Sequence, residues 1–291
     1  MRFLLSITFN VSIYALLGMS LNLPLGYSGM LLLCGASLFG IGAYTYAIAS
    51  HYSSSFIAIS IMAMCLGAVV AFLIGLITVR LRGDYFAIST LGFHIIINSI
   101  FSNWISLFGG PYGQRDIPPP RIGFWTLDSS LSYALLALVV VGTVFCICRF
   151  LLNLPYGRSL VAVRDSEVGA IAIGKNPSQL RISALTACGV VAALSGVLYA
   201  SQITYIDPLS FGFDEMIVIL ATVIIGGAGT LYGPIAGALI IVVLPEFLRS
   251  LSFDDANAGA IRQIILGTMF VVLMRVRPQG VAGRYRFLSS T

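Results

Sequence analysis

The sequence predicts an all-α polytopic membrane protein that crosses the bilayer about 8–10 times, and three observations lead to this fold class. First, 58% of its 291 residues are hydrophobic and only 9% are charged, whereas about a quarter of a typical soluble domain is charged. Second, several apolar runs exceed the roughly 18 residues that a spanning helix needs. Third, these runs are continuous, which excludes a membrane β-barrel, whose strands alternate polar and apolar residues. We therefore expect residues 1–291 to form a single transmembrane domain.

The first expected span covers residues 3–21. It is too long for a cleaved signal peptide and no A-x-A site follows it, so we expect it to remain as an anchor. After it come Gly26, Tyr27, Ser28 and Gly29, and then an apolar stretch that contains three more glycines. Glycines at this density either allow helices to pack closely or mark a helix that unwinds where it lines a cavity. The sequence leaves both interpretations open.

Two further spans are expected at residues 56–79 and 85–107. On the second, Thr90, His94 and Asn98 recur at every fourth residue and so share one face of the helix. Polar side chains at membrane depth face the bundle interior or a wet pathway rather than lipid. This polar stripe therefore either bridges neighbouring helices or contacts the substrate, and Thr90 and Asn98 are candidate pathway residues.

Residues 108–130 have the glycine- and proline-rich sequence of a loop, and spans are expected on both sides of a central charged segment, at 131–152 and 182–203. Residues 204–215 carry three acids and neither Lys nor Arg, which is typical of a loop on the outside of the membrane. The last span is expected at 261–274.

Residues 216–225 are too short to cross the bilayer, and they lead into a second glycine-rich stretch, which includes Gly226, Gly227 and Gly229. The apolar pattern resumes at residues 235–248. Two short apolar segments around a glycine-rich break indicate a discontinuous element of the kind that lines a transport pathway. We therefore expect this break, like the first one, to lie beside a pathway.

The largest break in hydrophobicity is the segment 153–181, which holds four Lys or Arg residues against two acids. Positively charged loops stay in the cytoplasm, so this segment is expected there. Within it, residues 167–173 predict a short helix, because Asp165 and Ser166 can cap its start and Gly174 can take the left-handed conformation that ends it. A helix of two turns is marginal alone in water. Its apolar side chains therefore rest either on a cytosolic partner or on the protein's own helix ends.

The distribution of Lys and Arg also predicts which loops share a side of the membrane. If the Arg-rich tail after Arg275 is cytoplasmic, the loops alternate from there back along the chain. The loops expected inside are 80–84, 153–181 and 226–234, and those expected outside are 108–130, 204–215 and 246–262. The side of the N-terminus depends on whether residues 26–50 cross the membrane or dip in and return, and the sequence allows both.

Other functional classes find little support in the sequence. The pattern Gly169-x4-Gly174-Lys175 resembles a phosphate-binding loop, but Asn176 replaces the Ser or Thr that would hold magnesium. Zinc-ligand clusters, Ser-His-Asp sets and paired intramembrane carboxylates are missing from the sequence, so nothing predicts an enzyme. A net charge of +5 that lies in loops and tail reports orientation, not nucleic-acid binding. An ion-coupled transporter would need a carboxylate inside a span, and none is expected there.

Several motifs resemble those of the LivM-type permease subunit of branched-chain amino acid ABC transporters. In chain order the motifs are 25–30, 39–44, 84–93, 109–113, 155–174, 226–234 and 277–280. They cover about residues 20–283 in unbroken order. The resemblance implies a multi-pass permease of the bacterial inner membrane that works with a second permease subunit, two cytosolic ATPases and a periplasmic substrate-binding protein. It also implies that ATP binds to the partner subunits, so no cofactor is expected in this chain.

By the same resemblance, 153–181 is the ATPase-coupling loop, and its motif residues are Arg164, Glu167, Ala170 and Gly174. Both glycine-rich breaks would line the translocation pathway. The sequence departs from the family at Cys34-Gly35, where Gly-His is usual, and at Ile95 and Asn98, where a Glu and an Arg are common. Branched-chain or related hydrophobic amino acids are the expected substrates. Urea or short amides, which close relatives carry, are the alternative, and ion-coupled transport is a weaker one.

Overall fold

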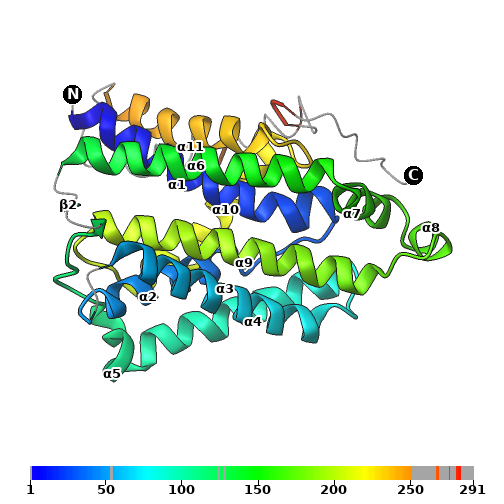
Figure 1. Ribbon diagram of the computed structural model, residues 1–291, viewed down its shortest axis with the longest axis horizontal. Coiled ribbons are helices and arrows are strands. Elements are labelled where there is room, and N and C mark those ends of the chain that lie inside the picture. Colours follow the sequence, from blue (N-terminus) through cyan, green and yellow to red (C-terminus); the bar gives the residue numbers. More distant parts are fainter. Residues whose placement is uncertain are drawn as a thin grey trace.

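The computed structural model describes residues 2–52, 55–122, 125–126, 129–250, 267–268, 275 and 280–282. These residues form a bundle of long helices that run between two ends (Figure 1). The helices are α1 (Arg2–Asn22), α2 (Gly35–Ala49), α3 (Phe56–Thr78), α4 (Asp84–Asn103), α5 (Ile105–Phe108), α6 (Ser130–Asn153), α7 (Pro155–Asp165), α8 (Glu167–Ala172), α9 (Pro177–Gln202), α10 (Phe213–Gly226) and α11 (Gly233–Ser250). Shorter elements are the π-helical turn η1 (Leu23–Tyr27), the 3-10 turns η2 (Gly110–Tyr112) and η3 (Pro208–Phe211), and an antiparallel pair of strands, β1 (Arg121–Ile122) and β2 (Trp125–Thr126).

The helices confirm the prediction of an all-α polytopic membrane protein. Within the described residues, six segments are long and apolar enough to cross a bilayer: Phe3–Tyr27, Phe56–Thr78, Asp84–Asn103, Ser130–Asn153, Pro177–Gln202 and Pro208–Gly226. The apolar helix α2 and the apolar part of α11 (Gly233–Phe247) lie among them. Large apolar side chains are exposed on the outside of the bundle, such as Ile77 on α3 and Val139 on α6, as a surface in lipid requires. The span expected at 261–274 lies outside the described residues, apart from 267–268.

One group of helices, the α9 group, consists of α2, α3, α4 and α9 (lower half of Figure 1). Small residues let these backbones approach closely. Gly42 of α2 lies against the carbonyl group of Ala193, and Gly67 of α3 lies against Gly189. A Cβ atom at Gly42 would overlap that carbonyl group. Since α2 is continuous through this contact, its glycines serve packing, and the first break is confined to the chain before the helix.

The other group, the α11 group, consists of α1, α6, α10 and α11 (upper half of Figure 1). α1 packs against α6, α10 and α11, and it also packs against α9, which joins the two groups. Glycines again set the closest approach, because a Cβ atom at Gly237 of α11 would overlap the carbonyl group of Thr222 in α10. The second glycine-rich break is therefore a turn between two helices that are held back to back.

The loops gather at two ends of the bundle as the charge pattern predicts. At one end, Arg82 of the α3–α4 loop meets Glu167 of α8, and Arg164 of α7 meets Gly26 of η1. At the opposite end, Gln114 pairs with Ile206 through backbone hydrogen bonds. For the described residues of these segments, the predicted grouping of 80–84, 153–181 and 226–234 on one side, and of 108–130 and 204–215 on the other, is confirmed. The loop expected at 246–262 lies outside the described residues beyond Ser250.

Residues 28–49 cross the bundle, which decides the question that the sequence left open. Gly29 lies against Arg164 at the α8 end, whereas the hydroxyl of Tyr46 donates to the carbonyl oxygen of Pro118 at the other end, at 3.2 Å. A segment without regular secondary structure (residues 28–34) and then α2 make this crossing. The N-terminus therefore lies at the end opposite α8 (Figure 1).

Three expectations about element boundaries are wrong. Segment 153–181 is mostly helical rather than a loop around one short helix, because α7 begins at Pro155, the position at which proline suits a helix start. α10 begins at Phe213, so the apolar segment Pro208–Gly226 is long enough to cross, unlike the 216–225 segment that we expected. The span expected at 85–107 ends at Asn103, and α5 follows as a separate turn.

Candidate functional site at the charged end of the bundle

Short helix α8 lies at the tip of one end of the bundle (Figure 1) and has the caps that the sequence predicts. The side-chain oxygen of Ser166 accepts a hydrogen bond from the backbone N–H of Gly169 at 3.1 Å. Gly174 has a φ of +76°, and the N–H of Lys175 bonds the carbonyl oxygen of Ala170 at 3.0 Å. These bonds satisfy groups that a helix end leaves open, so α8 is a defined element.

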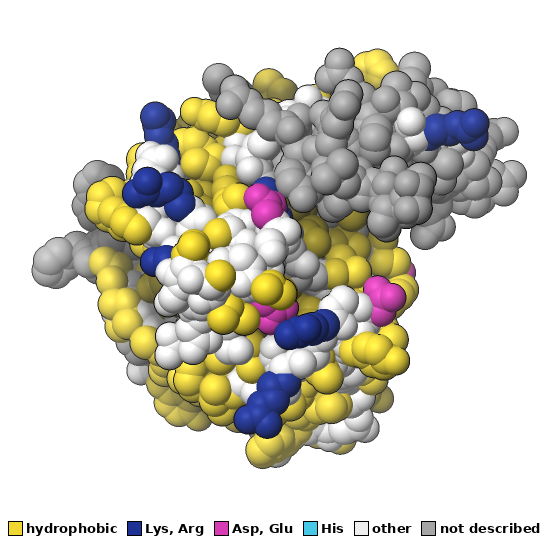
Figure 2. Space-filling view, turned by 90° about the vertical axis from the view of Figure 1, so that its right-hand side faces the viewer, with side chains coloured by type: hydrophobic (Ala, Val, Ile, Leu, Met, Phe, Trp, Pro, Cys, Tyr) yellow, Lys and Arg dark blue, Asp and Glu magenta, His cyan; other side chains and the backbone are white. Residues whose placement is uncertain are grey.

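The apolar side chains of α8 divide into one that faces the protein and three that do not. Ala170 is 1% exposed, whereas Val168, Ile171 and Ile173 are 79%, 55% and 66% exposed. The alternative that Val168, Ile171 and Ile173 rest on the protein's own helix ends is therefore wrong in this arrangement, and only Ala170 of the four is buried. Figure 2 views this end and shows Lys and Arg side chains around a surface that also carries hydrophobic side chains.

Glu167, the first residue of α8, ties the helix to the α9 group. One carboxylate oxygen lies 3.2 Å from Nη2 of Arg82, and the other lies 3.3 Å from Nη2 of Arg181. The Arg181 side chain is 15% exposed, while that of Arg82 is 75% exposed. Of the two ion pairs, the one with Arg181 is the less screened by solvent.

Arg164, near the end of α7, reaches the first glycine-rich break. Its Nη1 donates to the carbonyl oxygen of Gly26 at 2.7 Å, and its Nε donates to Asp165 at 3.1 Å. The side chain is 14% exposed. Gly29 lies against the aliphatic part of Arg164, and Gly229 lies against its guanidinium group. Arg164 thus lies between residues of both glycine-rich breaks, which are far apart in the sequence.

Asn22, the last residue of α1, completes this contact between the two breaks. Its side-chain oxygen accepts from the N–H of Gly229 at 2.9 Å, and its side-chain nitrogen donates to the carbonyl oxygen of Thr230 at 2.9 Å. Nothing in the sequence pattern singled out Asn22, because a lone Asn at a helix end is common. Two features could have pointed to this contact: Asn22 directly precedes the first glycine-rich break, and the backbone of the second break has polar groups that an Asn side chain can bind.

The predicted pathway residues of the first break differ in exposure. Gly26 and Ser28 are buried, Tyr27 is half-buried, and Gly29 is exposed with a φ of +71°. The hydroxyl of Ser28 has no hydrogen-bond partner among the described residues. In the second break, Gly227 and Gly229 also have positive φ, and Gly280 packs against Gly227.

A short described piece near the C-terminus closes over the second break. The N–H of Val281 bonds the carbonyl oxygen of Ile225 at 2.8 Å, and that of Ala282 bonds Gly226 at 2.9 Å. This piece follows the 277–280 motif, so the motif ends where the chain meets the end of α10. The C-terminal piece and segment 153–181 consequently share one end of the bundle.

The polar stripe of α4 points into the bundle as predicted. The N–H of Leu33 donates to the hydroxyl of Thr90 at 3.2 Å, and Ser37 lies 2.7 Å from Nδ1 of His94. The side-chain nitrogen of Asn98 donates to the carbonyl oxygens of Pro208 and Phe211, at 3.1 and 3.2 Å. All three side chains therefore bridge elements in this arrangement, and the stripe fixes both the start of α2 and the turn η3.

Glu215 corrects the expectation that no carboxylate lies inside a span. It belongs to α10, within the apolar segment Pro208–Gly226, and accepts a hydrogen bond from the hydroxyl of Tyr14 on α1 at 3.3 Å. Sequence reasoning missed it because the helix was expected to start at residue 216. A carboxylate in a membrane span is costly and needs a partner, and half-buried Glu215 has Tyr14 as a partner here.

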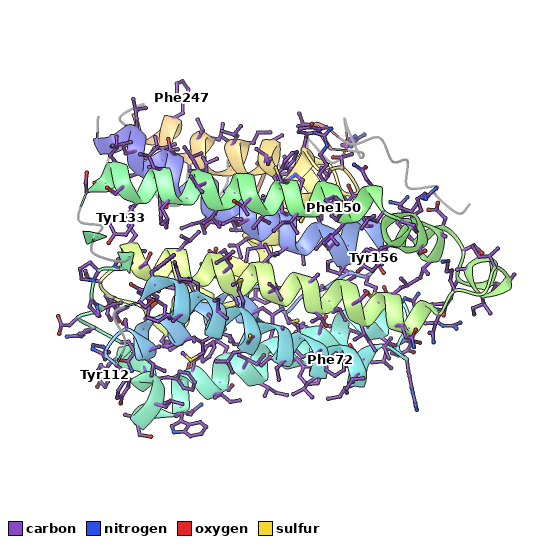
Figure 3. All side chains as sticks on the ribbon, viewed as in Figure 1. Phe72, Tyr112, Tyr133, Phe150, Tyr156 and Phe247 are labelled. Carbon is purple, nitrogen blue, oxygen red and sulfur yellow. The ribbon has the colours of Figure 1, made fainter. Side chains whose placement is uncertain are left out.

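A groove of about 510 Å³ lies beside α8, between α7 and the start of α9. Its walls include Ser159, Lys175 and Gln179, together with Tyr156, whose hydroxyl lies 2.9 Å from that of Ser183 (Tyr156 is labelled in Figure 3). Burial raises the pKa of Tyr156, so its hydroxyl keeps its proton at neutral pH. The groove gives a partner a concave surface next to the exposed apolar side chains of α8.

Comparison with known proteins adds the following. A family model described as branched-chain amino acid transport system / permease component matches residues 3–274. The high-affinity branched-chain amino acid transport system permease protein LivM of Salmonella typhimurium is 34% identical in an alignment of 294 positions that covers 92% of this chain and 67% of that protein. The probable LivM of Methanocaldococcus jannaschii is 25% identical in an alignment of 320 positions that covers 92% of this chain and 90% of that protein. The autoinducer 2 import system permease protein LsrC of Yersinia pseudotuberculosis is 29% identical in an alignment of 252 positions that covers 80% of this chain and 66% of that protein. No solved structure gives a significant match.

Proposed function

The chain belongs to the family of branched-chain amino acid transport permease components, and from this premise we propose that it is the membrane-spanning subunit of an ABC importer in a bacterial inner membrane. In this proposal a second permease subunit, two cytosolic ATPases and a periplasmic substrate-binding protein complete the transporter. The chain contributes the translocation pathway, and its partners bind and hydrolyse ATP.

The observation that carries this proposal is the exposed apolar surface of α8. Val168, Ile171 and Ile173 are more than half exposed on a helix that is capped, anchored by Glu167 and located at the tip of the charged end. Exposed apolar side chains that cluster at one place are typical of an interaction site. Docking of an ATPase on this surface, with the neighbouring groove, would couple ATP hydrolysis to the permease.

Branched-chain amino acids are the substrates that the similarity favours. Two of the relatives named above are LivM proteins, and the greater identity is to one of them. The LsrC relative, an autoinducer 2 import permease by name, means that the same family also serves a different substrate. Urea or short amides remain the second candidate, because the sequence departs from the usual family pattern at Cys34, Ile95 and Asn98.

The glycine-rich breaks and the α4 stripe are proposed to lie along the pathway. Two observations support this for Gly26–Gly29 and for Gly226, Gly227 and Gly229. Residues of both breaks lie against Arg164, and both breaks interrupt the regular α-helices. Irregular backbone within a membrane protein is tolerated where it is enclosed by protein or lines a cavity. Thr90 and Asn98 belong to the other helix group and point from α4 toward the chain before α2 and toward η3.

Ion-coupled transport gains one specific observation, which is the carboxylate of Glu215 inside a span. Its hydrogen bond to Tyr14 accounts for it as a structural contact, and membership of the family weighs against the alternative. An ABC importer is driven by ATP hydrolysis and an ion-coupled transporter by an ion gradient, so an uptake assay distinguishes the two.

The test is uptake of labelled leucine by proteoliposomes that contain the purified permease pair with its ATPases and binding protein. We expect uptake to require ATP and to proceed without an ion gradient. Leucine uptake that follows an ion gradient and ignores ATP would contradict the proposal. Competition by unlabelled valine, urea or acetamide then assigns the substrate class.

A further inference from the structure

The connection between α7 and α8 holds the two helix groups through two separate side chains. Arg164 lies two residues before the N-cap residue Ser166, and Glu167 directly follows it. We call this segment, residues 164–167, the two-armed junction. If the α8 surface docks an ATPase, as proposed above, this junction is the part of the chain through which displacement of α8 first reaches the membrane helices.

The Arg164 arm reaches the α11 group. Its guanidinium group bonds Gly26 after α1 and lies against Gly229 in the turn between α10 and α11. Asn22 fastens the two breaks to each other through Gly229 and Thr230. Displacement of Arg164 would therefore move residues of both glycine-rich breaks together.

Among the described residues, the ion pairs of the Glu167 arm lie in the α9 group. Its two carboxylate oxygens lie 3.2 Å from Arg82 in the α3–α4 loop and 3.3 Å from Arg181 in α9. Hydrogen bonds of this kind hold to about 3.2–3.5 Å. A shift of α8 by more than about 1 Å must therefore move the partners of both arms or break the contacts.

Two buried polar atoms near the junction have no hydrogen-bond partner among the described residues. One is the hydroxyl oxygen of Ser28, which lies in the first break between Gly26 and Gly29. The other is Nε of Arg181, the residue that pairs with Glu167. Buried polar groups are nearly always paired, and an unpaired one costs free energy. A second arrangement of the junction that pairs these atoms would recover that free energy.

We infer that Arg164 and Glu167 are positioning residues that convert displacement of α8 into movement of the two helix groups relative to each other, with Arg164 acting on the glycine-rich breaks. The inference rests on the proposed function. It adds that Arg164 is needed for coupling rather than for ATPase docking, since its side chain is buried against the permease while the exposed apolar side chains belong to α8.

The test compares Arg164→Ala with Arg80→Ala in the complete transporter in proteoliposomes. Arg80 is the control, because it is an exposed arginine at the same end of the bundle and lies outside the segment 153–181. Three quantities are measured: the ATPase that co-purifies with the permease, the rate of ATP hydrolysis, and the leucine taken up per ATP hydrolysed. For Arg164→Ala we expect normal co-purification and continued hydrolysis, but uptake per ATP lower by about tenfold or more, the usual effect of losing a charge-assisted hydrogen bond. Arg80→Ala should match the wild type.

An Arg164→Ala transporter with wild-type uptake per ATP would overturn the inference. If this variant does not assemble, hydrogen–deuterium exchange on the wild-type complex decides the question. We expect ATP to change exchange at residues 22–34 and 227–232 as well as in α8, and a change confined to α8 would also overturn it. Failure of the proposed function is distinct, because it would be seen as absent ATP-dependent uptake in the wild type.

Discussion

Val168 and Ala170 lie two positions apart on α8 and face opposite ways, with 79% of Val168 exposed and 1% of Ala170 exposed. The sequence motif includes Ala170 as a coupling residue, and the structure places it against the protein's own helices. The surface that is left for a partner consists of Val168, Ile171 and Ile173. Ala170 therefore supports the position of this surface from beneath.

Ala170→Arg is expected to destabilise the permease itself. The new side chain would have to bury an unpaired charge or push α8 away from α9, and either costs several kcal/mol. The amount of permease in the membrane fraction should fall, as measured by immunoblot. Ile171→Arg, on the exposed side of the same helix, is the control and should leave that amount unchanged. Equal amounts of the two variants would mean that Ala170 is not a packing position.

Gly42→Ala should weaken the contact between α2 and α9. The added Cβ atom would overlap the backbone carbonyl of Ala193, which cannot turn away as a side chain could. We expect a loss of about 1–3 kcal/mol, which is typical of overpacking, and a lower thermal unfolding temperature in detergent. Gly142→Ala on α6 is the matched control, since a Cβ atom there meets nothing within 4 Å. A Gly42→Ala protein as stable as the control would contradict the packing role.

Asn98→Leu separates the two roles of the α4 stripe. The change leaves the carbonyl oxygens of Pro208 and Phe211 without their donor and removes a polar group that faces the interior. We expect uptake per permease molecule to fall more than membrane abundance, because η3 would lose its position beside the pathway. If uptake and abundance fall in proportion, Asn98 is an interhelical bridge alone.

Orientation can be measured with single cysteines in a cysteine-free background. Ser178 is exposed near α8, and Leu209 is 84% exposed at the opposite end. Ser178→Cys should resist a membrane-impermeant thiol reagent in intact cells, and Leu209→Cys should react, because the Lys- and Arg-rich end is expected in the cytoplasm. The reverse labelling pattern would place α8 outside the cell and remove any contact with an ATPase.

Local signals in the sequence were enough to predict most of α8 and the long spans. Ser166 and Gly174 take the capping roles that their residue types predict, and the grouping of loops follows from the positions of Lys and Arg. The start of α10 at Phe213 was missed because Asp214 and Glu215 look like loop residues. In the structure both lie in the first turn of the helix, where acids favour the helix dipole.

The arrangement around Arg164 could not be derived from local pattern. Its partners, Gly26 and Gly229, come from two loops that approach only when α1 packs against α11, and such long-range contacts leave no periodic signal. For the same reason the sequence could not decide whether residues 28–49 cross the bundle. Contacts of Gly29 and Tyr46 with opposite ends decide it.

The central claim, that α8 docks an ATPase, is tested most directly by Val168→Arg. The control is Leu209→Arg, the same kind of change at an exposed apolar residue of the opposite end. Both permeases are purified from membranes that co-express the ATPases, and the ATPase recovered per permease is measured. We predict normal permease levels for both variants, loss of ATPase and of ATP-dependent uptake for Val168→Arg, and wild-type recovery for Leu209→Arg. Wild-type recovery of ATPase with Val168→Arg, together with unchanged hydrolysis in the presence of the binding protein, would contradict the claim.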